Sequence, residues 1–347
     1  MLLSLCIGVL SCDAAQGADN AAGPEVRQIP AGAADEMAVR EEIINKTWAL
    51  LEMRDVAGVD RLARTYRDRR ERTPSGTFKV AYVHYTIRDF LQDGGRTPCG
   101  EQRQAYVEDW IKAAPQSPTA IIAYAQDFVL QGLCARGPGP ADKVDPKVSS
   151  IFRNKMQIAA AALQDNKAAG AEDPHWYALM EEVAAYQRWD EPKFDALHAE
   201  AVSKFGWDYQ IYFHAGRYYS PRWGGSVEAF DRFARRSAEH SRGTDGTGLY
   251  ARIYWNAMQE GDLYHDLKHY SRADLDLLRT SMRDVADRYP NNWNYNNFAW
   301  ISCRNEMFAE AKAYLDKITD SPTYPPWPTP AIFEACKDMA RRTAPSV

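Results

Sequence analysis

The chain has 347 residues, of which 45% are hydrophobic and 26% are charged, a composition typical of a folded soluble protein. Its net charge of −5 at pH 7 and its isoelectric point near 5.9 give no overall basic surface. Because phosphate binding needs such a surface, this charge argues against nucleic acid as the main partner.

The first twelve residues resemble a bacterial signal peptide. Leu2 to Leu10 is an apolar run too short to span a bilayer as a mature helix. Val9-Leu10-Ser11-Cys12 matches a lipobox, in which cleavage precedes a cysteine that then carries lipid, so we expect lipidation at Cys12. Simple secretion, with cleavage near Ala14 or Ala15, is the alternative. The sequence thus predicts a periplasmic protein anchored by lipid to a bacterial membrane, or otherwise a secreted one.

Residues 13–35 are rich in Ala, Gly, Pro and Asp, with almost no large apolar side chains. Such a segment buries too little surface to order itself, so we expect a flexible tether between the anchor and a folded body.

Four cysteines follow the leader: Cys99, Cys134, Cys303 and Cys336. An even number in an exported chain suggests disulfides, and four cysteines allow three pairings. Pairing of sequence neighbours gives Cys99–Cys134 and Cys303–Cys336, each spanning about one helical hairpin. Zinc is a weaker interpretation, because no C-x-x-C pair is present.

From residue 36 onward nearly every segment has helical periodicity and helical end signals. The apolar faces of Met37–Leu51 and Val59–Tyr66 predict the first two helices. Further helices are predicted at 78–91 and 105–114, and another begins at Pro118. Three more begin where an acidic residue precedes proline, at 145–146, 173–174 and 190–192. The remaining helices are predicted at 208–219, 226–241, 248–260, 271–289, 293–304, 306–318 and 330–342.

The clearest break in the chain is Gly137-Pro138-Gly139-Pro140. It divides an N-terminal helical region, residues 36–136, from a C-terminal helical-repeat region, residues 141–347. It marks a boundary either between two subdomains or only between two hairpins.

No segment shows convincing strand alternation, so the predicted fold class is all-α, an α-solenoid of helical hairpins joined by short loops. Residues 294–318 match the tetratricopeptide pattern without a gap, with Tyr295, Phe298 and Ala299 in the first helix. Ala311 and Leu315 take the corresponding places in the second helix. The sequence therefore predicts a tetratricopeptide-like solenoid.

Five short motifs occur in a fixed order: R-T-P-S-G-T (72–77), D-P-H-W-Y-A-L-M (173–180), P-R-W-G-G-S (221–226), G-L-Y-A-R-I-Y-W (248–255) and N-W-N-Y-N-N-F-A (292–299). Together they resemble a bacterial domain-of-unknown-function family with tetratricopeptide-like helices, over roughly residues 55–320. The resemblance implies a helical-repeat fold and brings no activity that can be transferred.

The glycine pair in the third motif is predicted to be a turn between helices. Pro221 stops the preceding helix, Gly224 and Gly225 permit positive φ angles, and Ser226 can cap the next helix. A phosphate-binding loop would need G-x-x-x-x-G-K-[ST] after a strand, which is not found here.

Aromatic residues are about twice as frequent in 207–255 as in the whole chain. The first interpretation is core packing, because Trp and Tyr bury well between paired helices. The second is a concave binding face with exposed rings. In that hypothesis the ligand-binding residues are His214, Arg217, Arg222, Trp223, Tyr250 and Arg252.

The sequence predicts no catalytic residue, metal site or cofactor. His265 and His269 are spaced to share a helix face, but Asp266 stands where H-E-x-x-H has glutamate, and no third ligand is evident. His214 is the best single acid–base candidate, although it has no identifiable Asp partner or nucleophile. Glu181 and Glu182 are adjacent and therefore point to different helix faces.

Export signals, a tether and helical repeats together predict a non-enzymatic binding or scaffold protein of the cell envelope. Its repeat surface would recognise a protein or peptide partner, and its only membrane contact would be the lipid anchor. The alternative is a glycan-binding protein or a hydrolase acting on cell-envelope material through the 207–255 cluster, because aromatic rings stack on sugars and arginine binds carboxylates.

Overall fold

The computed structural model of the protein describes residues 35–92, 101–139, 143–259, 266–319 and 326–343. Within these ranges the chain forms seventeen α-helices and a 3-10 turn, with no strand beyond an isolated bridge between Arg72 and Phe78. The predicted all-α class is therefore confirmed. The leader with Cys12 and nearly all of the predicted tether lie outside the described residues.

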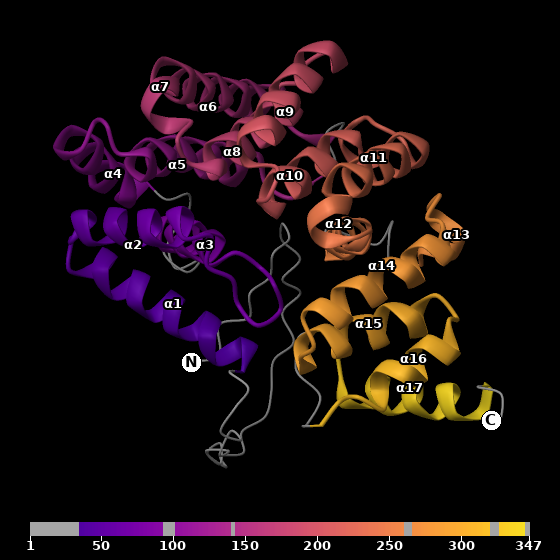
Figure 1. Cartoon of the computed structure of the whole chain (residues 1–347). Coiled ribbons are helices and arrows are strands. Elements are labelled where there is room, and N and C mark those ends of the chain that lie inside the picture. Colours follow the sequence, from indigo (N-terminus) through magenta and orange to yellow (C-terminus); the bar gives the residue numbers. More distant parts are fainter. Residues whose placement is uncertain (1–34, 93–100, 140–142, 260–265, 320–325, 344–347) are drawn as a thin grey trace, which may run out of the picture.

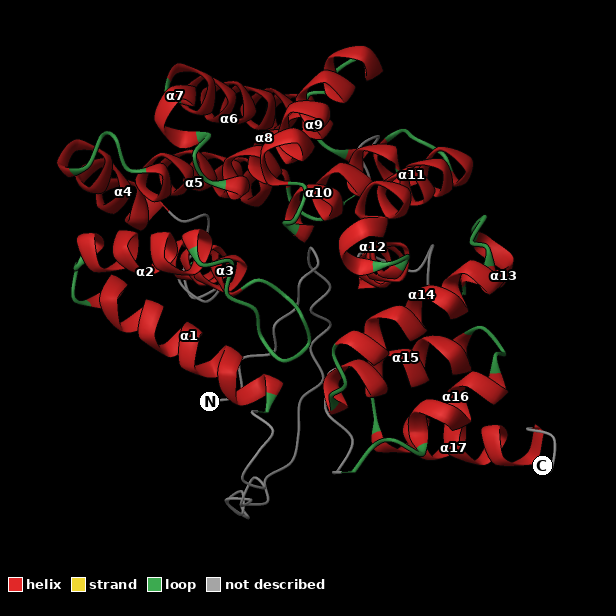
Figure 2. Ribbon diagram, viewed as in Figure 1, coloured by secondary structure: helices red, strands yellow, loops and turns green. Residues whose placement is uncertain are grey.

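The helices follow one another along an arch (Figure 1) and are joined mainly by short loops (Figure 2). Both ends of the described chain lie at the open side of this arch, with the first helix across from the last four. The helices are α1 (Glu36–Glu52), α2 (Val56–Asp68), α3 (Lys79–Leu91), α4 (Glu101–Ala113), α5 (Pro118–Arg136), α6 (Pro146–Asp165), α7 (Lys167–Gly170), α8 (Pro174–Tyr186), α9 (Glu191–Phe205), α10 (Tyr209–Tyr219), α11 (Val227–Asp245), α12 (Gly248–Gln259), α13 (Leu267–Tyr270), α14 (Leu275–Arg288), α15 (Asn292–Arg304), α16 (Phe308–Leu315) and α17 (Pro330–Thr343).

Neighbouring helices pack as hairpins, among them α5 on α6, α11 on α12 and α15 on α16. This succession of pairs is consistent with an α-solenoid. No helix of the described ranges is both long enough and apolar enough to cross a bilayer.

Two hydrophobic cores fill the arch, and they meet along α5. Ala120 and Leu130 face a smaller core built from α1 to α5, whereas Ile122 and Val129 belong to a larger core that continues to α17. The Gly/Pro break at 137–140 lies beyond the end of α5, and α5 packs closely on α6 across it. The two cores are therefore divided within a helix rather than at the break.

The predicted acidic helix starts are confirmed. The carboxylates of Asp145, Asp173 and Asp190 accept hydrogen bonds from backbone N–H groups in the first turns of α6, α8 and α9, at 2.7, 2.9 and 3.0 Å. The helix predicted at 271–289 instead begins at Leu275, because Asp274 caps it and the preceding residues form the separate short helix α13.

The disulfide predicted between Cys303 and Cys336 is confirmed. Their Cα atoms lie 5.8 Å apart. The bond joins α15 to α17, with α16 between them in the chain, so the expectation that it ties one helix to the next is wrong. Cys99 lies outside the described residues, so the predicted Cys99–Cys134 pairing stays a prediction.

Replacing Cys303 and Cys336 together by serine should lower the free energy of unfolding by about 3 kcal/mol, because the unfolded chain regains the freedom of the closed loop. Urea denaturation followed by circular dichroism measures the change. An unchanged denaturation midpoint would contradict the expectation.

Candidate functional site

Helix α8 is buried along its whole length, and yet it carries charge. All thirteen of its residues are buried, and the side chains of Asp173, Glu181 and Glu182 have no exposed surface. A buried carboxylate is costly unless it is paired and hydrogen-bonded, so each of these three must find partners on neighbouring helices.

Most of these partners form one row of polar side chains between α3, α8 and α10, which we call the seam. Helical spacing explains the row, because residues three, four or seven apart share a helix face. The seam comprises His84 and Arg88 on α3, Asp173, His175, Glu182 and Tyr186 at α8, and His214 and Arg217 on α10.

The closed end of the seam is at Asp173. Its carboxylate lies 3.1 Å from His84 Nε2 and 3.3 Å from Arg67 Nη1 while it also caps α8. Burial alone would raise the pKa of Asp173, but these partners outweigh it and hold the pKa well below its usual range. The rings of His84 and His175 stack at 4.2 Å, and burial followed by the neighbouring histidines lowers the pKa of His175, which keeps that imidazole neutral.

The other end of the seam gathers around Glu182. Its carboxylate accepts hydrogen bonds from Arg217 Nη1 at 2.8 Å, from Tyr186 Oη at 2.8 Å and from Arg88 Nη1 at 3.4 Å. His214 Nδ1 lies 3.5 Å away. Burial would raise the pKa of Glu182, but the charges of Arg88 and Arg217 dominate and keep it ionised. Arg88 retains 24% of its side-chain exposure, so the seam opens toward solvent at this end.

Glu181 faces the opposite side of α8, as the adjacency of the two glutamates predicts. Its Oε1 lies 2.8 Å from Nδ1 of His198 on α9. Burial raises the pKa of Glu181 to about 7, an effect that His198 only partly offsets. Below about pH 7, Glu181 is therefore mainly protonated whereas Glu182 is ionised, although they are neighbours in sequence.

The structure brings together four of the six predicted ligand-binding residues. His214 and Arg217 meet at Glu182, the ring of Trp223 packs at 5.0 Å on that of Tyr186, and the Arg222 guanidinium lies 6.0 Å from the Trp223 ring. Whether they bind a ligand stays a prediction.

The other two predicted residues lie elsewhere. Tyr250 has no exposed surface and donates a hydrogen bond to Asp231 at 2.6 Å, so its expected place on an open face is wrong. Arg252 instead contacts the loop after α2, because its guanidinium donates to Ser75 O at 2.8 Å.

The turn predicted at the glycine pair is confirmed. Pro221–Trp223 forms a 3-10 turn, Gly224 has a φ of 100°, and the Ser226 hydroxyl caps α11 by accepting from Ala229 N at 3.1 Å. A Cβ on Gly225 would lie 2.0 Å from the Tyr219 carbonyl oxygen, so glycine is required there.

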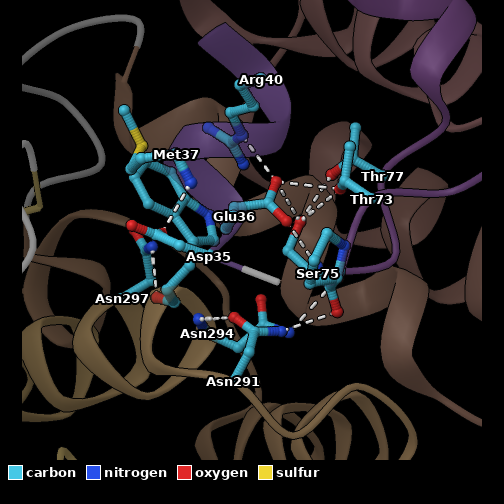
Figure 3. Close-up of polar contacts among 12 residues, drawn as sticks. Asp35, Glu36, Met37, Arg40, Thr73, Ser75, Thr77, Asn291, Asn294 and Asn297 are labelled. Atoms are coloured by element: carbon cyan, nitrogen blue, oxygen red, sulfur yellow. Dashed lines mark hydrogen bonds and ion pairs between the residues drawn. The ribbon is translucent and has the colours of Figure 1, made fainter. Parts of the chain in front are cut away.

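A second polar centre, which sequence reasoning missed as a site, holds the loop Arg72–Thr77; we call this loop and its contacts the clasp. Figure 3 shows Glu36, at the start of α1, pointing at the loop. The Glu36 carboxylate accepts four hydrogen bonds, from Arg40 Nε at 2.6 Å, Thr73 Oγ1 at 2.9 Å, Ser75 N at 2.7 Å and Ser75 Oγ at 2.9 Å.

The opposite side of the loop is held by the C-terminal helices. Asn291 Nδ2 donates to Pro74 O at 2.8 Å, and Asn294 Nδ2 and Arg252 Nη2 donate to Ser75 O at 3.3 and 2.8 Å (Figure 3 shows the asparagines). The clasp thus joins residues more than two hundred positions apart. Three of the five sequence motifs supply residues to it, namely those at 72–77, 248–255 and 292–299. These motifs were the only feature of the sequence that could have indicated the clasp.

A recess of about 340 Å³ lies between α16 and α17, lined by apolar Leu315 and Phe333 and by charged side chains such as Lys337.

Among the described residues no group of three or more His, Cys, Asp or Glu side chains is arranged to hold a metal ion. His265 lies outside those residues, and His269 Nδ1 lies 2.8 Å from the Asp266 carboxylate.

Comparison of the chain with protein-family models, with curated proteins and with solved structures finds no match. The resemblance to a domain-of-unknown-function family therefore stays a prediction.

Replacing Glu182 by alanine should lower the free energy of unfolding by about 3 kcal/mol or more, because two partly buried guanidiniums lose their counter-ion. Replacing Glu228, an exposed partner of Arg272, should leave stability unchanged within error and serves as the control. Equal effects in urea denaturation would contradict the role given to Glu182.

Glu181 gives a pH prediction whose sign follows from its raised pKa. Between about pH 4.5 and pH 7 the folded chain keeps a proton on Glu181 that the unfolded chain has released, so stability from this group falls as the pH rises. Glu181→Gln keeps an acceptor for His198 and cannot ionise. The free energy of unfolding of Glu181→Gln minus that of the unchanged protein should therefore increase by on the order of 2 kcal/mol from about pH 5 to about pH 8. A constant difference between the two proteins would contradict this.

Proposed function

We propose that this protein is a non-enzymatic binding or scaffold protein of the cell envelope, which recognises a protein or peptide partner through its helical-repeat surface. Its hairpins are, in this proposal, tetratricopeptide-like repeats. The leader and the lipidation at Cys12 would place it in the periplasm on a lipid anchor. Stacked helix pairs support the proposal because they make extended surfaces suited to binding another chain.

The observation that carries the proposal is the open end of the seam. Arg88 and Arg217 lie there around a buried carboxylate, beside the rings of Tyr186 and Trp223. Arginine, tyrosine and tryptophan are the residues that most often dominate binding energy at protein interfaces, because each combines apolar area with directed polar groups. Held by Glu182 and by each other, these side chains are also ordered before a partner arrives, which lowers the entropic cost of binding.

One specific observation favours the second candidate function, a glycan-binding protein or hydrolase. Trp223 is partly exposed, packs on the buried ring of Tyr186 and lies next to Arg222, and such a ring can stack on a sugar while arginine binds its carboxylate. His214 would be the acid–base group of a hydrolase at this end of the seam.

A photo-crosslinking amino acid at Arg222 tests the proposal, because Arg222 is exposed and next to Trp223. In cell-envelope extract we expect it to capture one specific protein, whereas the same group at exposed Arg242 on α11 captures none. Capture should fall by about tenfold when Arg88 is replaced by alanine, because an interface arginine of this kind typically contributes 1 kcal/mol or more.

The result of this crosslinking experiment distinguishes the protein-binding function from the glycan alternative. Competition by soluble cell-wall fragments, or their hydrolysis, would favour the glycan alternative. Capture from a crosslinker at Lys337 but not from Arg222 would move the binding surface to the α16–α17 recess and contradict the proposal.

A further inference from the structure

The three donors on the C-terminal side of the clasp form hydrogen bonds only with main-chain atoms of the loop. Arg252, Asn291 and Asn294 give their hydrogen bonds to the carbonyl oxygens of Pro74 and Ser75, and to no side chain of the loop. Recognition of carbonyl groups depends on the shape of the backbone and not on the identity of the side chains. Extended peptide segments are bound through main-chain hydrogen bonds in this way, and the carbonyl groups of a turn offer the same acceptors.

The loop presents a defined backbone shape to these donors. Gly76 N donates to Thr73 O at 2.9 Å and closes a turn, and Thr73 N donates to Thr77 O at 2.8 Å. Gly76 has a φ of 88°, and a Cβ there would lie 2.7 Å from the Tyr289 ring and 2.8 Å from Arg252 Nη2. The surface made by Tyr289 and Arg252 therefore accommodates a turn that has glycine at the position of Gly76.

The two asparagines are held in place independently of the loop, and Arg252 lies against two aromatic rings that Arg72 of the loop also contacts. Asn291 caps α15 by accepting from Asn294 N at 3.0 Å, and the side-chain amides of both asparagines donate to Tyr289 O, at 3.0 and 2.9 Å. The guanidinium of Arg252 lies 4.7 Å from the ring of Tyr209 and 5.6 Å from that of Tyr289. Helix α15 and these rings would keep the donors oriented if the loop were absent.

The loop has a separate attachment on its other side. Thr73 and Ser75 bind Glu36 of α1, and these contacts involve no residue of α12 or α15. The loop is thus bound by α1 on one side and by residues of α12 and α15 on the other. The α12–α15 side has the features of a preformed receptor for a peptide turn.

We propose that Arg252, Asn291, Asn294 and Tyr289 form a peptide-binding site that the chain's own loop 73–77 occupies, and that a partner enters by presenting a glycine-containing turn in its place. This inference rests on the proposed function and names the chemistry of the partner segment. The chain's own loop is then an autoinhibitory occupant, held locally at an effective concentration that a free peptide must overcome.

The probe is a cyclic peptide containing residues 72–78, Arg-Thr-Pro-Ser-Gly-Thr-Phe, titrated against the full chain. Glu36→Ala removes the hydrogen bonds that Thr73 and Ser75 make to α1 and leaves every donor of the site intact, whereas Arg72 keeps its hydrogen bonds to Tyr209 Oη and Gly76 O. Gly76→Ala displaces the loop by a different route, through the clash with Tyr289. We expect either variant to bind the peptide about tenfold more tightly than the unchanged protein, because the competing intramolecular segment is weakened.

Two controls make the test specific. Gly224→Ala alters another glycine with positive φ, at which a Cβ meets nothing within 4 Å, and it should leave peptide affinity at that of the unchanged protein. Adding Asn291→Ala and Asn294→Ala to the Glu36→Ala variant should abolish the gain in affinity. Hydrogen exchange of the 73–78 amides reports in the same samples whether the loop has left the site.

The inference is overturned if the loop amides exchange faster in either variant and the peptide still does not bind, or if binding survives loss of both asparagines. It is equally overturned if neither variant speeds exchange of the loop, because the loop is then a fixed part of the fold. Crosslinking from Arg222 reports on the seam and not on the clasp. Its success together with failed peptide binding would reject this inference and leave the proposed function standing.

Discussion

The arrangement of this protein depends on one constraint, which is the presence of ionisable side chains on a helix that has no exposed face. Asp173 and Glu182 are ionised at positions without solvent, so each needs cationic or hydrogen-bonding partners at defined distances. Those partners come from α2, α3 and α10, while His198 on α9 serves Glu181. Apolar contacts tolerate sliding of one helix along another, whereas these hydrogen bonds do not. The seam therefore fixes how the first three helices sit on the larger core.

Seam and clasp have complementary roles. Both connect the smaller N-terminal core to the larger one by polar contacts. The seam lies between α3, α8 and α10, and the clasp joins α1 to α12 and α15 across the open side of the arch (Figure 1). The seam is deep, and breaking it leaves charges buried. On its α12–α15 side the clasp consists of hydrogen bonds to main-chain carbonyl oxygens, each worth only about 1 kcal/mol net, whereas on its α1 side Glu36 also forms a buried ion pair with Arg40. The seam is thus the permanent connection between the two cores and the clasp the weaker one, whose contacts an external ligand can replace. This difference in strength underlies the further inference that we propose.

The sequence predicts local features well and long-range ones poorly, for identifiable reasons. Asp145-Pro146 and Asp173-Pro174 start helices, the glycine pair at 224–225 makes a turn, and Cys303 and Cys336 pair across a separation of 33 residues. In each case the interaction lies within a few turns or within 33 residues of chain. The arginine side chains and His84 that hydrogen-bond to Asp173 and Glu182 lie 35 to 106 residues away, and periodicity gives the face of a helix but not the helix opposite. Tyr250 illustrates the same limit, since periodicity places it on a face of α12 but does not show that α11 and α14 cover that face.

Hydrogen exchange across the whole chain, resolved by mass spectrometry, tests most directly whether α8 is the element on which the fold depends. Amides of a helix that is surrounded on every side and fixed by buried charge pairs should exchange only through global unfolding. The account predicts that peptides covering 174–186 exchange most slowly of all, with an opening free energy equal to that of global unfolding. Exchange of 174–186 by local opening, ahead of α5 or α15, would contradict it.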